Sequence, residues 1–327
     1  MSDIAIILPV YNGGEYVKLA VESVLQQTYK DFEFYIIDDC STDKSWSYLN
    51  SLSDPRIRLL QNEVNRGLFY NLNLLIKSSS TGVIKLWSQD DIMYPECIEK
   101  VMTFYQKNPQ VGFIYTGRDY IDENGTLIVK DFVDRTPEII PTLLHARIAL
   151  YTGSIAGNIA NVAISREAIN KVGLFREDMK ISGDFDMWVR LAQYYPVGFI
   201  NEPLIQLRDH KNQLSRQETF YIYHLKEDVQ VYNRLLGYIP DNTREEGKKM
   251  LRNYKLMFYY TLMLKSFLKG KWRTGAKFWK TLSSFDSMGL LTISFVKNML
   301  FNGKRKSGNF IKDNSFLFGQ YDKNAII

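Results

Sequence analysis

The sequence predicts an α/β protein with a mainly parallel, Rossmann-like central sheet flanked by helices, followed by a helical C-terminal region. In the first 120 residues, short apolar runs alternate with segments whose apolar residues recur at helical spacing. That alternation is typical of parallel strands joined by right-handed helical crossovers. Beyond about residue 217 the spacing is helical throughout, which sets this last third of the chain apart.

The first part of the chain supplies five strands and four helices by this criterion. The strands are expected at residues 4–10, 32–37, 57–60, 83–87 and 111–115. The helices are expected at about residues 17–25, 43–52, 67–77 and 96–105. Asn12 and the run Ser41-Thr42-Asp43 are good residues to cap the first two helices, because their side chains can accept hydrogen bonds from free N–H groups.

The second part is less regular. Residues 122–125, Asp-Glu-Asn-Gly, predict a hairpin turn, and residues 131–160 are interpreted as loop with some helix. A strand is expected at 159–164, a short helix from Ser165 to about Gly173, an amphipathic helix at 184–195, and strands at 197–200 and 204–207. We therefore divide the chain into residues 1–216, with halves at about 1–118 and 119–216, and a helical region at 217–327.

Composition limits the class of protein. With 327 residues, the chain can bury a substantial core and still carry an appendage. Its two cysteines, Cys40 and Cys97, do not form a disulfide framework and favour a reducing compartment. The N-terminus lacks a basic region followed by a long apolar run, and no stretch of about 18 apolar residues occurs, so neither a signal peptide nor a spanning helix is expected.

Charge is distributed unevenly along the chain. From Asp241 onward there are 17 Lys and Arg and 6 Asp and Glu, whereas the preceding residues hold the other 24 basic and 30 acidic residues. Between Gly247 and Lys312 the only acidic residue is Asp286, and the basic residues interleave with aromatics. This pattern favours helices at an anionic membrane surface. The alternative is a helical appendage that packs on the body or forms homo-oligomers; nucleic acid is not an expected partner.

Acidic pairs follow two of the predicted strands. Asp38-Asp39 follows the second strand, and Asp90-Asp91 follows the apolar run that ends at Trp87. Adjacent carboxylates repel each other, and a hard divalent cation with phosphate oxygens would remove that cost. The alternative interpretation of the second pair is a solvated strand end or a helix N-cap at Asp91. Ligands bind beyond the carboxyl ends of such strands, so these pairs and Tyr11 predict a site there.

Several short motifs together resemble the family-2-type inverting glycosyltransferases of the GT-A fold. The resemblance runs from residue 4 to about residue 215, two thirds of the chain, and leaves the helical region outside. The motifs are Leu8-Pro9-Val10-Tyr11-Asn12, residues 23–29 and 37–43, Asn65-Arg66-Gly67, residues 88–91, Gly183-Asp184 and residues 207–210. Each motif is weak alone, and their order and spacing carry the resemblance.

The resemblance implies a nucleotide-sugar donor, with a UDP-sugar favoured, bound by the first half of the domain. By this similarity Tyr11 would stack on the base and Pro9 would shape the same pocket. Asp39 would accept a hydrogen bond from the base, while Asp38 would bind there or brace the turn. Arg66 would contact the nucleotide, or else be a solvated loop arginine.

The resemblance also implies Mn²⁺ or Mg²⁺ at the diphosphate and a single catalytic carboxylate. Asp91 would ligate the cation, Asp90 would face the ribose or the cation, and His210 is a further candidate ligand or a structural histidine. Asp184 would be the general base that takes the proton of the acceptor hydroxyl. Asp186, two residues further on, points elsewhere on a helix and is the second choice.

Three positions depart from the family pattern. Ser88 stands where the family often has Asp, which reduces the acidic motif to Gln89-Asp90-Asp91. Cys40 stands where many relatives have Gly or Asn, and we interpret it as a packing residue. Gly183 replaces a frequent Glu before the base, which removes a charge that would raise the pKa of Asp184.

These observations predict a metal-dependent inverting transferase that moves a sugar to a saccharide or lipid-linked saccharide during surface polysaccharide synthesis. It would lie in the cytoplasm, peripherally on the inner face of the membrane. One alternative is a nucleotidyltransferase or phosphohydrolase using the same cation, which would need a second phosphate clamp. The other is a non-catalytic sugar-nucleotide-binding or assembly subunit, which only a turnover measurement distinguishes.

Overall fold

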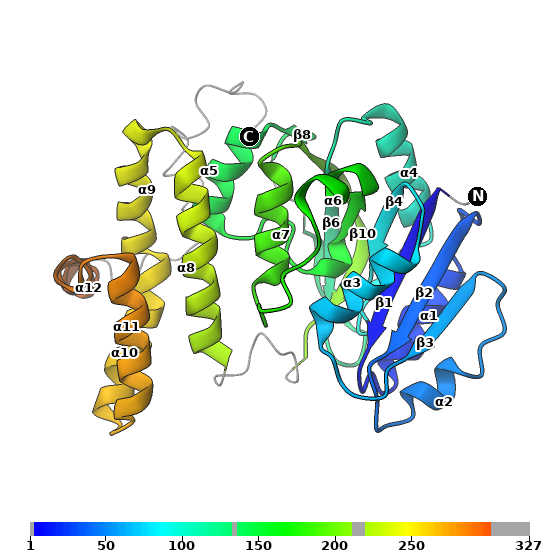
Figure 1. Cartoon of the computed structure of the whole chain (residues 1–327), viewed down its shortest axis with the longest axis horizontal. Coiled ribbons are helices and arrows are strands. Elements are labelled where there is room, and N and C mark those ends of the chain that lie inside the picture. Colours follow the sequence, from blue (N-terminus) through cyan, green and yellow to red (C-terminus); the bar gives the residue numbers. More distant parts are fainter. Residues whose placement is uncertain (1–2, 133–135, 211–219, 302–327) are drawn as a thin grey trace. The chain divides into compact units, whose positions relative to one another are not determined.

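The computed structural model describes residues 3–132, 136–210 and 220–301 (Figure 1). The chain divides into two compact units, which are described separately. The first contains Met1–His145 and Ser154–Gln213, and the second contains Ala146–Gly153 and Leu214–Ile327. Residues 146–153, which the sequence analysis places in the first domain, thus group with the C-terminal helices.

The first unit is built on one sheet, in which the described residues form ten strands in the order β3-β2-β1-β4-β9-β6-β10-β5, with β7 beside β6 and β8 beside β10. The strands are β1 (Ile4–Val10), β2 (Phe32–Asp38), β3 (Ile57–Gln61), β4 (Val83–Leu86), β5 (Ile92–Met93), β6 (Phe113–Ile121), β7 (Leu127–Phe132), β8 (Ile139–Ile140), β9 (Val162–Ser165) and β10 (Val197–Arg208).

The first four predicted strands are confirmed and lie parallel, in the order β3-β2-β1-β4. The other half of the sheet is mixed, because β9 runs antiparallel between β4 and β6. The predicted hairpin at residues 122–125 is also confirmed, since β6 and β7 pair antiparallel on either side of it. The parallel half therefore supplies the strand ends at which a ligand site was expected.

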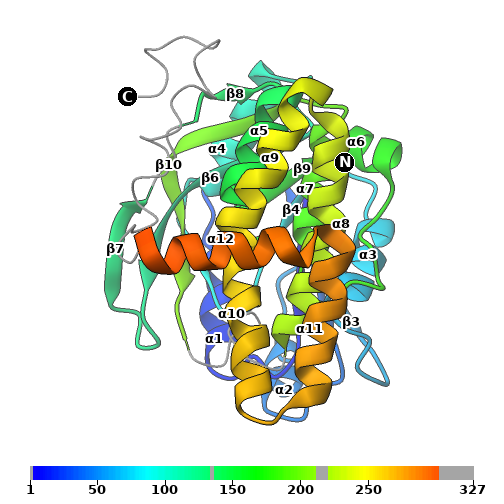
Figure 2. The same cartoon turned by 90° about the vertical axis from the view of Figure 1, so that its left-hand side faces the viewer.

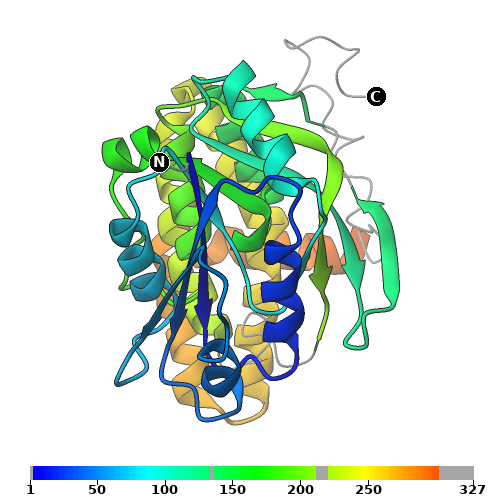
Figure 3. The same ribbon diagram turned by 90° about the vertical axis from the view of Figure 1, so that its right-hand side faces the viewer.

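The helices of the first unit are α1 (Tyr16–Leu25), α2 (Ser45–Leu49), α3 (Leu68–Ser78), α4 (Cys97–Lys107), α6 (Arg166–Val172) and α7 (Gly183–Ala192), with a 3-10 turn at Ile159–Asn161. Helix α5 (Thr142–Thr152) belongs to the second unit from Ala146 onward. Figure 3 shows α1 and α4 on one face of the parallel strands and α3 on the other. The helix predicted from Ser165 to Gly173 is confirmed: the Ser165 side chain accepts from the Ala168 N–H, and Gly173 ends the helix at φ +84°.

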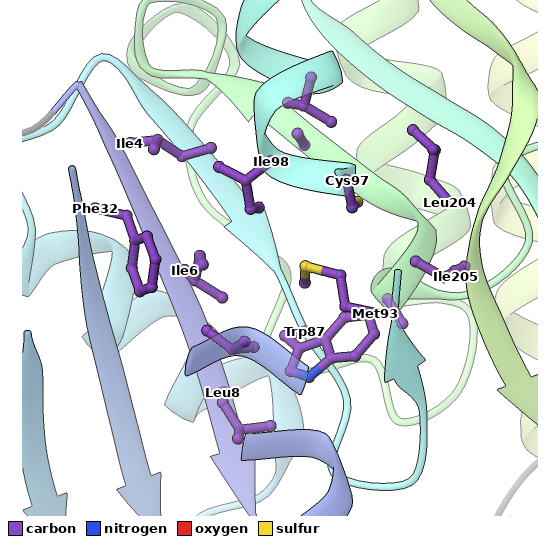
Figure 4. Packing of buried hydrophobic residues seen from close by; sticks show 14 of the residues in the cluster. Ile4, Ile6, Leu8, Phe32, Trp87, Met93, Cys97, Ile98, Leu204 and Ile205 are labelled. Atoms are coloured by element: carbon purple, nitrogen blue, oxygen red, sulfur yellow. The ribbon is translucent and has the colours of Figure 1, made fainter. Parts of the chain in front are cut away.

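Side chains along β1 point alternately to the two faces of the sheet, and those on one face form the core between the sheet and helices α1 and α4. Ile4, Ile6 and Leu8 point to the same side of the strand and pack in one buried cluster with Trp87 and Cys97 (Figure 4). All five side chains are fully buried. Burial on both faces of the strand explains its unbroken apolar run, and it holds the carboxyl end of β1 rigidly in place.

One of the two predicted helix caps is wrong. Asn12 adopts a left-handed φ of 49° and its Oδ1 accepts from the Thr42 N–H, while α1 begins after Glu15 without a side-chain cap. Asp43 bonds in two directions: its Oδ1 accepts from the N–H of Ser45, the first residue of the short α2, at 2.9 Å, and its Oδ2 accepts from the Gly14 N–H. Both side chains thus bond to another loop, because the two loops lie at the same edge of the sheet.

Three other local expectations also need correction. Asp91 does not cap a helix, because β5 follows it directly and pairs with β10. The strands expected at 197–200 and 204–207 form the single strand β10, whose register shifts between Ile200 and Ile205. The strand expected at 159–164 begins as a 3-10 turn and becomes β9 only at Val162.

The second unit is helical, as predicted, with α8 (Tyr221–Tyr238), α9 (Asp241–Asn253), α10 (Lys255–Leu268), α11 (Trp272–Phe285) and α12 (Met288–Phe301). Its core includes Leu225 of α8, Tyr260 of α10, Leu282 of α11 and Leu291 of α12. Figure 2 shows α10 and α11 as an antiparallel pair with α12 running across them. Among the helices that the structure describes, none is both long and apolar enough to cross a bilayer.

Candidate active site

The loop after β1 is held by side chains from two other loops. The Tyr11 N–H donates to Gln89 Oε1 at 2.8 Å, and Gln89 Nε2 donates back to the Tyr11 carbonyl at 3.1 Å. The N–H groups of Asn12 and Gly13 donate to the hydroxyls of Ser41 and Ser45. This loop is therefore fixed through its backbone, which leaves the exposed Tyr11 ring available to a ligand.

Asp39 organises the neighbouring loop. Its carboxylate accepts from Asn62 Nδ2 at 2.7 Å, from the Arg66 N–H at 2.8 Å and from the Gly67 N–H at 2.9 Å. Asp39 is only 2% exposed, so these three hydrogen bonds hold its carboxylate within the loop. Asp39 thus has a structural role that the sequence analysis did not predict.

Asp38 is fully buried beside it. Its Oδ2 accepts from the Ser41 N–H at 3.1 Å and from Gln61 Nε2 at 3.3 Å, so it braces the turn. Cys40 follows with a left-handed φ of 63°, the conformation that favours Gly or Asn. Its thiol donates to the Glu63 carbonyl at 3.4 Å, so it packs against the 62–67 loop.

Pro9 and Arg66, the other two residues predicted to contact the nucleotide, lie at the same edge of the sheet. Pro9 is partly buried near the end of β1, directly opposite Ile37 of β2. The Arg66 side chain is exposed, with its guanidinium 5.5 Å from the centre of the Tyr70 ring. Its backbone N–H is bound to Asp39, so the structure fixes the Arg66 backbone and leaves its side chain at the surface.

Pairing of β5 with β10 brings Asp90 and Asp91 against the end of β10. Asp91 Oδ1 accepts from the Arg208 N–H at 2.9 Å, and Arg208 Nε donates to the Asp90 carbonyl at 3.0 Å. The Arg208 guanidinium also lies 4.4 Å from the centre of the Tyr16 ring and donates to the Asp122 carbonyl at 3.0 Å. Arg208 thus connects the acidic turn to α1 and to the β6–β7 hairpin.

The two acidic side chains differ in access. Asp91 is only 3% exposed, and burial raises its pKa to about 7 against the opposing effect of the Arg208 N–H. The Asp90 side chain is 25% exposed; burial raises its pKa as well, and His210 opposes that shift. Asp90 is therefore the more exposed of the two carboxylates, whereas Asp91 is buried and holds the backbone of β10 through its Oδ1.

His210 completes this arrangement. Its Nε2 lies 3.5 Å from Asp90 Oδ2, so the imidazole faces the carboxylate as an ion-pair partner. Its ring also packs 5.6 Å from the Tyr16 ring. An imidazole nitrogen and a carboxylate oxygen are both ligand types that bind divalent cations such as Mn²⁺. Within the described ranges, no group of three or more such side chains is placed to hold a metal alone.

The third acidic segment begins α7. Asp184 is partly buried in the first turn, where its Oδ1 accepts from the Phe185 N–H at 2.7 Å. Asp186 is 1% exposed, and its Oδ2 lies 2.7 Å from Arg190 Nε in an ion pair one turn along the helix. Arg190 also donates to the Val172 carbonyl. Asp186 is thus a structural residue, and Asp184 is the accessible carboxylate of the pair.

Gly183 lets α7 approach the first turn of α3. A Cβ atom at Gly183 would lie 2.6 Å from the Phe69 ring, far inside van der Waals contact. Phe69 lies two residues beyond Gly67, whose N–H is bound to Asp39. The N-terminal end of α3 therefore contacts both the Asp39 carboxylate and the residue before Asp184. The absence of a larger residue at position 183 is explained by packing.

We expect Gly183→Ala to destabilise the protein by about 1–3 kcal/mol, the usual cost of overpacking. The added methyl group would force the Phe69 ring to move. Thermal or urea unfolding measures the effect, and combining Gly183→Ala with Phe69→Leu should recover part of the loss. If Gly183→Ala unfolds like the unaltered protein, the approach of α7 to Phe69 is not a tight constraint.

The sequence did not predict the roles of three residues at this site, Gln89, Arg208 and Asn62. Gln89 and Arg208 lie inside motifs that carry the family resemblance, but nothing in their spacing showed that Gln89 holds Tyr11 or that Arg208 holds both Asp90 and Asp91. Asn62 carries no local signal, because its bonds to Asp39 and to Asn71 Oδ1 join separate loops. The (i, i+4) spacing of Asp186 and Arg190 was a usable signal for their ion pair.

Comparisons with known proteins agree with this geometry. A family model described as glycosyl transferase family 2 matches residues 5–173, and the chain belongs to that family. An uncharacterized glycosyltransferase of Rickettsia felis is 32% identical over 218 residues, which cover 65% of this chain and 35% of the relative. This chain thus spans about a third of the length of that relative.

Solved structures of glycosyltransferases share the fold. S. aureus TarS 1-349 in complex with UDP-GlcNAc has a TM-score of 0.66 and 17% identity, covering 99% of this chain and 93% of that one. The mannosyltransferase PcManGT from Pyrobaculum calidifontis, in complex with GDP-Man and Mn²⁺, has a TM-score of 0.56 and 15% identity, covering 92% and 88%. The GT-A type of α/β fold predicted from the sequence is confirmed.

Proposed function

We propose that this glycosyltransferase is inverting and depends on a divalent cation, Mn²⁺ or Mg²⁺. It would move a sugar from a nucleotide-sugar donor, most favourably a UDP-sugar, to a hydroxyl of a saccharide or lipid-linked saccharide in surface polysaccharide synthesis. The observation that carries the proposal is the convergence of Tyr11, Asp39 and the Asp90–His210 pair at one edge of the sheet. The UDP-GlcNAc and GDP-Man bound to the structural neighbours support a nucleotide-sugar donor.

The donor base would bind between the first two loops. Tyr11 would stack on it, with its backbone already held by Gln89, and Pro9 would form the floor beside it. Asp39 would accept a hydrogen bond from the base, and Arg66 would reach the nucleotide from the surface. Because these loops are fixed by hydrogen bonds before the ligand arrives, little ordering would oppose binding.

Asp90 and His210 would hold the cation, and the donor diphosphate would supply further oxygen ligands. When bound, the cation stabilises the negative charge that develops on the departing nucleoside diphosphate. Asp91, which the sequence analysis assigned as a ligand, would instead orient the site, because its carboxylate holds the Arg208 N–H. Arg208 in turn holds the Asp90 carbonyl and so fixes the direction of the Asp90 side chain.

Asp184 would be the general base. It would take the proton of the acceptor hydroxyl as that oxygen forms a bond to the anomeric carbon of the donor sugar. The bond from that carbon to the diphosphate oxygen would break at the same time, and its electron pair would leave with the nucleoside diphosphate. One such displacement inverts the anomeric centre and needs only one carboxylate, in keeping with the structural commitment of Asp186 to Arg190.

Nucleotide binding tests the first part of this proposal. We expect UDP with Mn²⁺ to raise the melting temperature, because a ligand at 100 times its Kd stabilises a protein by about 2.7 kcal/mol. Tyr11→Ala should weaken UDP binding about 5- to 100-fold, since stacking on an aromatic ring contributes about 1–3 kcal/mol, and Tyr11→Phe should preserve it. Equal affinity of Tyr11→Ala and the unaltered protein in calorimetry would remove Tyr11 from the base site.

The same proposal places the protein peripherally on the inner face of the cytoplasmic membrane. The excess of Lys and Arg beyond Asp241 supports association of the second unit with an anionic membrane, on the cytoplasmic side where lipid-linked acceptors and sugar nucleotides would meet. Homo-oligomerisation through the same helices is the alternative. A turnover assay separates an enzyme from a non-catalytic nucleotide-sugar-binding subunit, which would bind UDP without transferring sugar.

A further inference from the structure

The turn between α10 and α11 exposes large apolar side chains to water. Leu268 is 88% exposed at the end of α10, and Trp272 is 68% exposed at the start of α11. Trp279 lies two helical turns beyond Trp272 on the same outward side of α11 and is also exposed. The buried face of α11 is formed by Phe278 and Leu282, which pack in the core of this unit. Trp272 lies beside that face and packs on the Phe267 ring, with the ring centres 5.5 Å apart, yet most of its surface stays exposed.

The backbone holds these side chains in a firm hairpin. Gly270 turns the chain at φ +70°, and the Lys271 N–H donates to the Ser266 carbonyl at 2.9 Å. Gly275 lies against Phe267 so closely that a Cβ atom there would be 2.6 Å from the ring. Two helices that approach this closely present Leu268 and Trp272 on a preformed surface. We call the segment from Lys265 to Lys280 the hairpin tip.

The hairpin tip is strongly basic and has no acidic residue. Its charged side chains are all exposed: Lys265, Lys269, Lys271, Arg273, Lys277 and Lys280. The nearest acidic residue after it in the chain is Asp286, which bonds to Arg252 Nε at 2.6 Å and is largely buried. The positive charge of the tip is therefore not offset by acidic residues of its own helices, and it surrounds the exposed apolar side chains.

We propose that the hairpin tip is the membrane-docking surface of this protein and that its partner is an anionic lipid surface. Leu268, Trp272 and Trp279 would enter the headgroup region, and the surrounding Lys and Arg would bind lipid phosphates. Aromatic and aliphatic side chains ringed by cations are the combination that binds at such an interface. The inference rests on the membrane association proposed above and adds the surface that carries it.

Charge favours the hairpin tip over the other exposed apolar face of this unit. Helix α12 also exposes Leu290, Ile293 and Val296 at helical spacing. Within α12, however, Lys297 is the only charged residue. An apolar face with a single cation lacks the electrostatic complement to anionic lipid that the hairpin tip has, and so α12 provides a matched control.

The test uses the full-length protein and vesicles of phosphatidylcholine, either pure or mixed with phosphatidylglycerol. We expect co-sedimentation with the mixed vesicles at low salt, release at high salt and no binding to pure phosphatidylcholine. Trp272→Glu combined with Leu268→Glu should weaken binding at least tenfold. Ile293→Glu, at a position 52% exposed on α12, should bind like the unaltered protein.

A second pair of variants separates docking from folding. Lys269→Ser combined with Lys271→Ser leaves every apolar contact in place and should weaken vesicle binding severalfold, whereas Lys18→Ser on α1 should have no effect. The variants of α10, α11 and α12 should keep the UDP affinity of the unaltered protein, since these helices belong to the second unit. Brominated lipids should quench the fluorescence of Trp272, and Trp272→Phe should remove that part of the quenching.

Three results would overturn the proposal, and they differ in whether the membrane association of the protein also fails. If the hairpin variants bind as well as the unaltered protein and Ile293→Glu does not, docking occurs through α12 and membrane association still stands. If the unaltered protein ignores anionic vesicles at low salt, membrane association fails as well. If Trp272→Glu instead converts an oligomer to a monomer in sedimentation, the hairpin tip binds a second copy of the chain.

Discussion

Asp184→Asn should slow sugar transfer by roughly 100-fold or more while donor binding stays close to that of the unaltered protein. The amide keeps the size of the carboxylate but cannot accept the proton of the acceptor hydroxyl, and general-base catalysis contributes about 100- to 10,000-fold. Steady-state transfer from a UDP-sugar measures the rate, and calorimetry with UDP and Mn²⁺ measures binding. A slower transfer rate with unchanged UDP affinity distinguishes a general base from a residue that only holds the donor.

Asp186→Asn is the matched control for this experiment, since it makes the same chemical change on the same helix. Its carboxylate is buried and paired with Arg190. We expect this variant to lose about 1–3 kcal/mol of unfolding free energy, because a buried charged partner is left poorly satisfied. If folded Asp186→Asn lost transfer while Asp184→Asn retained it, the base would be assigned to the wrong carboxylate.

Asp90→Asn should abolish most of the Mn²⁺-dependent part of nucleoside diphosphate binding. It removes the reachable charged ligand opposite His210 Nε2, and His210→Ala should act in the same direction. We expect a loss of about 100-fold or more, above the 10- to 100-fold typical of residues that only orient a ligand. Titration of UDP with and without Mn²⁺ isolates the Mn²⁺-dependent part of the affinity, because binding without the cation reports only the contacts to the nucleotide base.

Asp91→Asn tests which of the adjacent acidic residues binds the cation. Its amide oxygen can still accept from the Arg208 N–H, so this variant should keep the architecture of the turn and most of its Mn²⁺ dependence. If Asp91→Asn loses Mn²⁺-dependent binding and Asp90→Asn does not, the original sequence-based assignment of Asp91 is correct. Unfolding measurements on both variants show whether either loss arises from reduced stability.

Much of the fold follows from local pattern. The strands β1 and β4 were predictable because they are buried on both faces, and β2 because its apolar residues alternate with partly buried ones before a fully buried end. The cap assignment of Asn12 failed because its side chain bonds to a loop some 30 residues away along the chain, and Asp43 bonds both to the start of its own helix and to that distant loop. A capping side chain has the same chemistry whether it bonds to its own helix or to another loop, and sequence spacing cannot separate the two.

The sequence by itself determined the α/β fold, the edge of the sheet where Tyr11, Asp39 and Asp90 gather, and the basic character of the second unit. Only the tertiary structure decided which of two neighbouring carboxylates is exposed and which is buried. Asp91 is buried because β5 pairs with β10, which delivers the Arg208 N–H to it from 117 residues away. The exposure and hydrogen bonding of a carboxylate depend on partners that are distant in the sequence. The hydrophobic periodicity that predicts a helix or strand depends only on the residues of that element.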